Sequence, residues 1–228
     1  MKTHLRKRHR KTRSYKRIYI LVTALALLVT GSLAYMLLNN KGEIHTINVK
    51  VGSTIYTFNI GYNTKLTYSW EQWLVYPNGT RIPFGKPSSG AYTYVIVNVS
   101  TQQIFGIKEI PIWFVVRIVK NGVELKGTSK VYFTSIALPM QLLGKPFLNL
   151  TPIKTTINIR GKSFSVWEYQ GKIKPRSPEC YILEDKYYYL ESNGLLVKEE
   201  VRCYIPHYSS YPNGTYILYY KELLEANN

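Results

Sequence analysis

The chain contains one long apolar run, and this run divides it into parts that fold in different surroundings. Residues 18–38 are 21 positions without a charged side chain. As a helix rising about 1.5 Å per residue, the run would cross a hydrocarbon core of ~30 Å. The sequence therefore predicts one transmembrane helix at 18–38, a tail at 1–17 and a domain at 39–228.

The charges beside the apolar run predict its orientation. Residues 2–17 carry nine Lys and Arg and no acidic residue, whereas the far flank carries little charge. Because basic flanks stay in the cytoplasm, we expect a single-pass protein of the cell membrane with residues 39–228 outside. The alternative is a signal peptide cleaved after Ala34, which would release a secreted domain. The long basic region and the continuation of the apolar run to Leu38 favour an uncleaved anchor.

The basic tail also bears on the expected partners. It accounts for just over half of the net charge of +17, so the rest of the chain is only moderately basic. Besides marking topology, the tail can bind anionic lipid head groups or, through counterion release, nucleic acid. Tyr15 is its only aromatic side chain available for base stacking. We therefore expect the lipid bilayer as a partner and no specific nucleic acid.

Beyond the anchor, hydrophobic residues recur with a period of two, which is typical of antiparallel strands. Residues 46–51 and 56–60 form one predicted hairpin across Gly52-Ser53, and residues 112–120 and 123–126 form another across Asn121-Gly122. A third joins 155–160 to 163–169 across Gly161-Lys162. Further strands are expected at 66–76, 92–99, 131–136, 181–191, 195–205 and 216–223, with single helical turns at 140–143 and 221–226.

These patterns predict an all-β extracytoplasmic domain: an antiparallel sandwich, meander or half-barrel. A division into two lobes near residues 145–152 is an alternative arrangement. The chain contains 21 Tyr, many of them in predicted strands. Tyr suits a half-buried sheet because its ring packs while its hydroxyl reaches a polar partner, and this role is favoured over sugar or polymer binding by stacking.

Four asparagines in the outer domain begin acceptor sequons for N-glycosylation. They are Asn78, Asn98, Asn149 and Asn213. All four lie beyond the anchor, where a glycosyltransferase could reach them in the predicted topology. Asn78 and Asn213 fall at predicted turns, whereas Asn98 lies within a strand pattern.

Cys180 and Cys203 are the only cysteines, and both belong to the predicted outer domain, where thiols oxidise. They bracket the predicted hairpin around residues 192–194, so we expect a disulfide between its two strands. The rival interpretation is a metal site completed by His207. That site lacks a convincing fourth ligand and CxxC spacing, so no metal and no cofactor are expected.

The sequence offers few groups for catalysis. The outer domain contains His45, His207 and Asp185 besides scattered Glu, and no GxSxG, HExxH, Walker or GxGxxG motif is present. Glu199 and Glu200 would point to opposite faces of a strand and could not act together. We therefore expect no catalytic residues and a protein that is not an enzyme.

The last sixty residues resemble segments of archaeal membrane-anchored β-rich proteins. The similar stretches are 187–190, 192–194, 195–198 and 215–218. Proteins of this design also occur in archaeal viruses, where the destination would be the host membrane or the virion envelope. The resemblance implies a surface-exposed β meander, with a curved half-barrel as one form, and it implies no functional residue.

Together these features predict a membrane-anchored, Tyr-rich, glycosylated β domain that binds a protein or glycan partner, or assembles at a surface or envelope. Two alternatives remain. One is a hydrolase of surface polymers or peptides, which requires a pocket gathering His207, Asp185 or Glu. The other is a carrier with an apolar cavity for a lipid or another hydrophobic ligand.

Overall fold

The computed structural model describes residues 45–102, 110–120, 122–173, 180–205 and 211–227. The predicted tail and transmembrane helix lie outside these residues. Within the described part of the chain, no helix is both long and apolar enough to cross a membrane. Residues from His45 onward form a compact unit built of antiparallel strands, so the expected all-β domain is confirmed.

The strands follow the chain in order. They are β1 (Ile47–Val51), β2 (Thr54–Phe58), β3 (Lys65–Val75), β4 (Arg81–Pro83), β5 (Ser89–Thr101), β6 (Ile112–Lys120), β7 (Val123–Glu124), β8 (Ser129–Tyr132), β9 (Thr151–Ile159), β10 (Lys162–Ile173), β11 (Ile182–Leu190), β12 (Leu196–Tyr204) and β13 (Tyr216–Asn227). A 3₁₀ turn, η1 (Phe133–Ser135), follows β8. All three hairpins predicted from the sequence are present, as β1–β2, β6–β7 and β9–β10.

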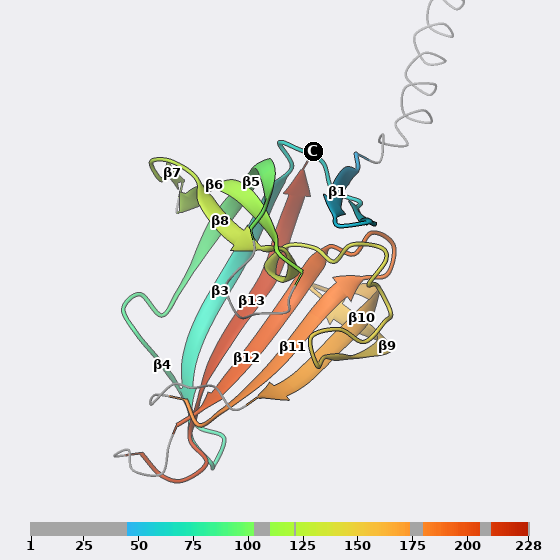
Figure 1. Cartoon of the computed structure of the whole chain (residues 1–228). Helices are drawn as coiled ribbons and strands as arrows, with labels where there is room; N and C mark the ends of the chain where they lie inside the picture. Colours follow the sequence, from blue (N-terminus) through green and yellow to red (C-terminus); the bar gives the residue numbers. More distant parts are fainter. Residues whose placement is uncertain (1–44, 103–109, 121, 174–179, 206–210, 228) are drawn as a thin grey trace, which may run out of the picture. The chain divides into compact units, whose positions relative to one another are not determined.

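In the described part of the chain, eleven strands form one curved sheet, whose strands Figure 1 labels. Its order is β7-β6-β5-β3-β13-β12-β11-β10-β9, with β4 added to β3 and β8 added to β6. The C-terminal strand β13 pairs with β3 and so joins the meander β9–β13 to the N-terminal half of the sheet. The right-handed twist of strands curves a long sheet, and bulges sharpen the bend. Bulges occur in β5, β12 and β13.

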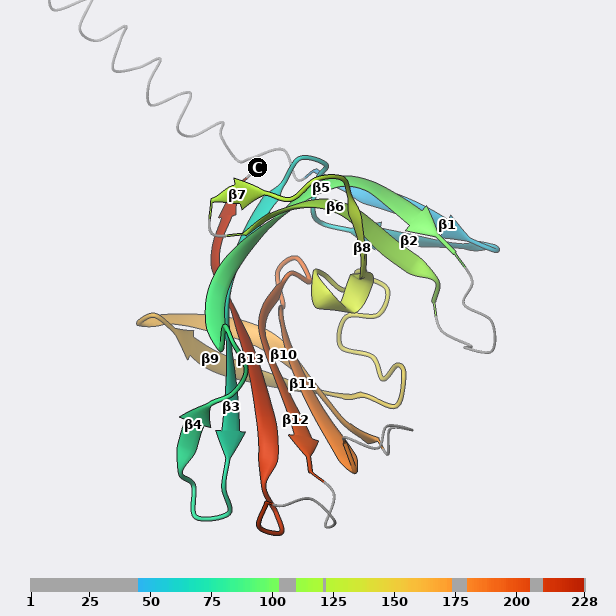
Figure 2. The ribbon, with the colours of Figure 1, turned by 90° about the vertical axis from the view of Figure 1, so that its left-hand side faces the viewer.

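The concave face of the sheet is partly filled by residues 133–150, which we call the covering segment. It connects β8 near one edge of the sheet to β9 at the other edge, and η1 lies within the curve (Figure 2). The β1–β2 hairpin adds Phe58 to the same core. The ring of Phe58 packs edge-on against Phe114 at 5.1 Å and Phe133 at 6.2 Å between centroids. The hairpin, the sheet and the covering segment therefore share one hydrophobic core.

Tyrosine hydroxyls hold the covering segment on the sheet. Tyr189 donates a hydrogen bond to the carbonyl of Thr134 at 2.6 Å, and Tyr169 donates one to the carbonyl of Leu142 at 2.7 Å. Both tyrosines lie in the core, where their hydroxyls would otherwise be buried without a partner. These tyrosines therefore have the packing role that their position in strands indicates.

Three local predictions are wrong. The strand expected at 131–136 ends at Tyr132, because the chain turns into η1 to enter the concave face. The helical turn expected at 221–226 is part of β13, because pairing with β3 supplies backbone hydrogen bonds that outweigh local propensity. The β9–β10 turn is Arg160-Gly161, both with positive φ, since Lys162 already pairs with Ile159.

Candidate functional site

A pocket of about 230 Å³ opens where the covering segment meets the concave face of β10 and β11. One wall comes from the sheet and the opposite wall from β8 and the covering segment. Its lining residues are Tyr132, Thr134, Leu148, Asn149, Leu150, Gly171, Asp185 and Tyr187. Aromatic, aliphatic and acidic groups therefore share one small cavity.

The strand register explains why the sheet residues of this pocket converge. Gly171 of β10 lies directly opposite Asp185 of β11, and Tyr187 follows two positions later on the same face. Because Gly171 has no side chain, the covering segment approaches closely there. A Cβ at Gly171 would press against the Cδ2 of Leu150. The glycine thus lets Leu150 of the covering segment pack onto β10 opposite Asp185.

Asp185 is the most unusual polar group of the pocket. Its Oδ1 is the one buried side-chain nitrogen or oxygen of the described residues that lacks a hydrogen-bond partner. Burial, and secondarily the negative charge of Glu199, raise the pKa of Asp185 to about 6. The carboxylate is therefore half-buried, poorly solvated and still largely ionised at neutral pH.

In contrast to Asp185, the neighbouring buried charges of Lys221 and Glu199 pair with each other. The Nζ of Lys221 lies 2.6 Å from the Oε2 of Glu199, and their side chains are only 3% and 10% exposed. Lys221 also donates to the carbonyl of Ser135 at 3.1 Å and lies 5.0 Å from the ring centroid of Tyr68. Lys221 thus has three partners and links the covering segment to β12 and β13.

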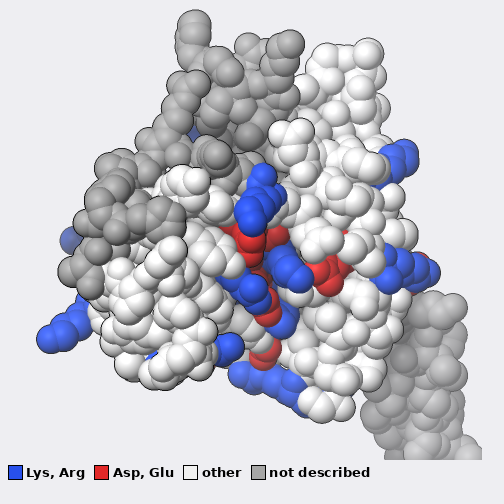
Figure 3. All heavy atoms as spheres, turned by 90° about the horizontal axis from the view of Figure 1, so that it is seen from below, with Lys and Arg blue, Asp and Glu red and all other residues white. Residues whose placement is uncertain are grey.

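The opposite face of the sheet carries charges in balanced pairs. Lys186 pairs with Glu168 at 3.1 Å, and Lys198 pairs with Glu200 at 2.7 Å. Figure 3 shows basic and acidic side chains side by side on the face seen from below rather than a patch of one sign. Such a mixed surface does not select a strongly charged partner.

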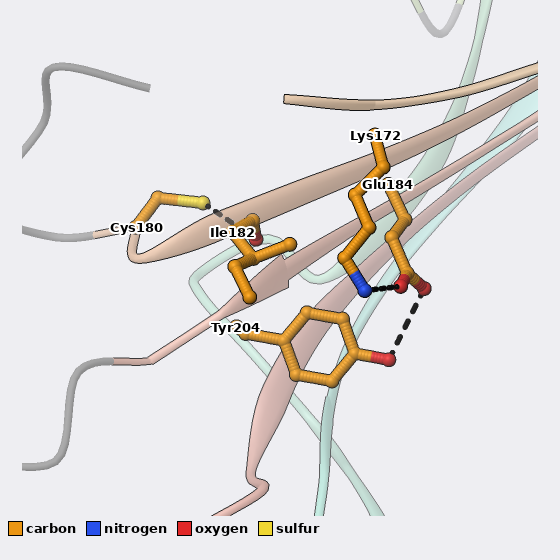
Figure 4. A network of polar contacts seen from close by, with 5 residues as sticks. All are labelled: Lys172, Cys180, Ile182, Glu184 and Tyr204. Atoms are coloured by element: carbon orange, nitrogen blue, oxygen red, sulfur yellow. Dashed lines mark hydrogen bonds and ion pairs between the residues drawn. The ribbon is translucent and has the colours of Figure 1, made fainter. Parts of the chain in front are cut away.

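The predicted cysteine partners lie at disulfide-bonding distance. Cys180 and Cys203 are joined in the structure, with Cα atoms 5.3 Å apart, and they bracket the β11–β12 hairpin as expected. The Sγ of Cys180 lies 3.3 Å from the carbonyl oxygen of Ile182 (Figure 4). This end of the meander is distinct from the pocket lining.

A polar network crosses three strands near the disulfide (Figure 4). Glu184 of β11 accepts hydrogen bonds from Lys172 of β10 at 2.8 Å and from Tyr204 of β12 at 3.1 Å. The hydrogen bond from Lys172 lowers the pKa of Glu184. This network cross-links the strand ends and leaves no carboxylate free for a ligand.

All four sequon asparagines have exposed side chains. Asn78 and Asn213 lie in turns, as predicted, and Asn98 lies in β5 beside a bulge. Asn149 stands at the pocket rim, where its φ of 63° is one that asparagine tolerates. Whether glycans are attached stays a prediction, because exposure is a requirement for glycosylation and no more.

The structure also places the titratable candidates. Glu199 is buried at the concave face and Glu200 faces the other way, so the sequence-based separation of this pair is confirmed. His45 is exposed, and His207 lies outside the described residues. In the described parts of the chain, no three His, Cys, Asp or Glu side chains gather as a metal site would require.

Sequence reasoning named Asp185 only as a weak catalytic candidate and did not find its pocket. One signal was available, because Asp185 is the only aspartate in the chain and sits in a strand, where aspartate is disfavoured. The covering segment that closes the pocket carries no comparable signal.

Comparison with known proteins gives no family assignment. No family model matches the chain, and no curated protein matches it. Among solved structures, the chain is similar to a LolA superfamily protein, NE2245, from Nitrosomonas europaea. The similarity has a TM-score of 0.17 and 8% sequence identity, and it covers 72% of this chain and 86% of the other. At this level it carries no functional argument.

Proposed function

We propose that residues 45–228 form a binding domain whose ligand site is the pocket around Asp185. The supporting observation is the unpaired, buried Oδ1 of Asp185 in a cavity whose lining includes Tyr132 and Tyr187. A buried polar atom without a partner costs free energy, and a ligand that supplies the partner recovers it. An orphan group of this kind in a concave site is typical of binding sites.

Binding is a better account than hydrolysis. General acid–base hydrolysis of a glycoside requires two carboxyl groups facing one space. Among the described residues, Asp185 is the only carboxylate that lines the pocket, and the nearby Glu199 is held by Lys221. We therefore assign the pocket to recognition without chemistry.

The test is a ligand screen with a pocket-closing variant. Gly171→Ala adds a methyl group to the pocket lining, against the Cδ2 of Leu150, without requiring an unusual backbone conformation, since Gly171 lies in β10. We expect at least one class among soluble glycans, peptides and phospholipids to raise the melting temperature of the full chain, and Gly171→Ala to reduce that shift. Shifts that are identical in both proteins would contradict the proposal.

We further propose that the domain is displayed outside the cell by an uncleaved anchor at residues 18–38. The disulfide partners at bonding distance support an oxidising compartment. Intact mass of the protein extracted from its native membrane tests this. The expected mass retains residues 2–38, includes added sugar and increases by about two mass units on reduction. A lighter chain starting after Ala34 would make the protein secreted.

A second candidate function is that of a hydrophobic-ligand carrier. A separate groove of about 360 Å³ has a mainly apolar lining, which includes Ile159, Phe164, Leu190, Val197, Leu223 and Leu224. Arg160 and Lys162 lie in the same lining and could accompany an anionic head group. The test is native mass spectrometry of the purified full chain with lipid. Retained lipid that is lost in Phe164→Asp would support a carrier, and a protein that never takes up lipid would exclude one.

A further inference from the structure

We propose that the Asp185 pocket receives a primary ammonium group at the end of an apolar stem, that is, a lysine side chain of a partner protein. This inference rests on the proposed binding function and specifies its ligand.

Among the described residues, no basic side chain pairs with Asp185, so the charge balance of the concave face favours a cation supplied by a ligand. Glu199 and Asp185 both place negative charge on the concave face, and Lys221 compensates only Glu199. Lys221 is already engaged by Glu199, the carbonyl of Ser135 and the ring of Tyr68. Lys186, the neighbour of Asp185 in the chain, points to the opposite face and pairs with Glu168. Within the part of the chain that the structure describes, the charge of Asp185 is therefore not compensated, and a half-buried carboxylate of this kind favours an incoming cation.

The lining matches the rest of a lysine side chain. Leu148 and Leu150 supply aliphatic surface for the methylene stem, and the rings of Tyr132 and Tyr187 supply aromatic surface near a cation. A volume of about 230 Å³ is suited to one side chain rather than to a polymer segment. The site thus combines aliphatic and aromatic surface with an unpaired carboxylate oxygen.

An aminolipid head group fits less well. Ethanolamine phosphate also ends in an ammonium, but its stem is short and a phosphate follows directly. That phosphate would approach the negative charges of Asp185 and Glu199, which disfavours it. We therefore commit to the lysine side chain and treat the head group as an outcome of the test.

Isothermal titration calorimetry on the full chain in amine-free detergent buffer tests the inference. The probes are N-acetyl-lysine methylamide and its uncharged counterpart N-acetyl-norleucine methylamide, together with phosphoethanolamine and phosphocholine. Asp185→Asn removes the charge of the pocket with little change in shape. Glu124→Gln removes one exposed carboxylate of β7 and serves as the matched control.

We expect the lysine probe to bind and the norleucine probe to bind at least about tenfold more weakly. Asp185→Asn should reduce the affinity for the lysine probe by a similar factor. Glu124→Gln should leave binding unchanged. Equal binding of the two peptide probes, preference for phosphoethanolamine or no effect of Asp185→Asn would overturn the inference. If a neutral ligand binds and Gly171→Ala weakens its binding, the assignment of a lysine side chain as the ligand is wrong, but the proposed binding function stands. Failure of every class in the wider screen would reject both.

Discussion

Replacing Asp185 by asparagine should stabilise the domain at neutral pH, although it removes a charge from the proposed ligand site. The folded-state pKa of Asp185 is raised from 3.8 to about 6, mainly by burial and then by Glu199. A shift of about two units corresponds to about 3 kcal/mol. Because the side chain is half-buried, solvent screening reduces this figure to on the order of 1–2 kcal/mol.

The sign of this effect depends on pH. Since the folded state holds the proton of Asp185 more tightly than the unfolded state, ionisation costs stability as pH rises from about 4 to about 6. Below pH 4 the acid is neutral in both states and resembles asparagine. The free energy of unfolding of Asp185→Asn should therefore equal that of the wild type near pH 4 and exceed it by roughly 1–2 kcal/mol above pH 6.5.

Urea unfolding monitored by tryptophan fluorescence, at several values between pH 4 and 8, measures this difference. Other carboxylates with shifted pKa values, such as Glu184, contribute equally to both proteins and cancel. Glu124→Gln controls for the loss of one negative charge. A stability difference that is constant with pH, or a destabilised variant above pH 6, would refute the reasoning.

Three other changes test the remaining parts of the structure. Lys221→Met leaves Glu199 buried and unpaired, so we expect a loss of about 3–5 kcal/mol in urea unfolding, and a loss below about 1 kcal/mol would contradict the tight pairing. Reduction, or Cys180→Ser with Cys203→Ser, should cost on the order of 3 kcal/mol by calorimetry, and an unchanged melting temperature would argue against a formed bridge. Asn78→Gln should remove one glycan from the intact mass, and an identical mass would show that this sequon is unused.

The hairpins could be predicted from the sequence because each depends on neighbouring residues. The β6–β7 hairpin is an example. Its sequence has one alternating run, then the dipeptide Asn121-Gly122, then a second run, and this local pattern predicts both the turn and the register. The pairing of β13 with β3 could not be predicted in this way. The two strands are separated by about 140 residues, so their register is set by packing of the whole sheet rather than by a turn.

The candidate site was less predictable than the fold. Its sheet wall depends on the register that places Gly171 beside Asp185, and its other wall depends on where the covering segment lies. The isolation of Asp185 depends in turn on Lys221 being held by Glu199, which requires β12 and β13 to be adjacent. No local pattern encodes these relations, whereas the disulfide could be inferred because Cys180 and Cys203 bracket one hairpin.

The two acidic groups of the concave face have opposite consequences, and the contrast indicates which one has a structural role. Glu199 is buried together with Lys221, and Lys221 also binds the covering segment. This pair therefore has a structural role. Asp185 is half-buried, and its Oδ1 has no hydrogen-bond partner among the described residues. A group that lowers stability at neutral pH persists in a sequence when function compensates for its cost. If Asp185→Asn proves more stable and also loses the lysine probe, the stability deficit and the binding function will both be traced to one carboxylate.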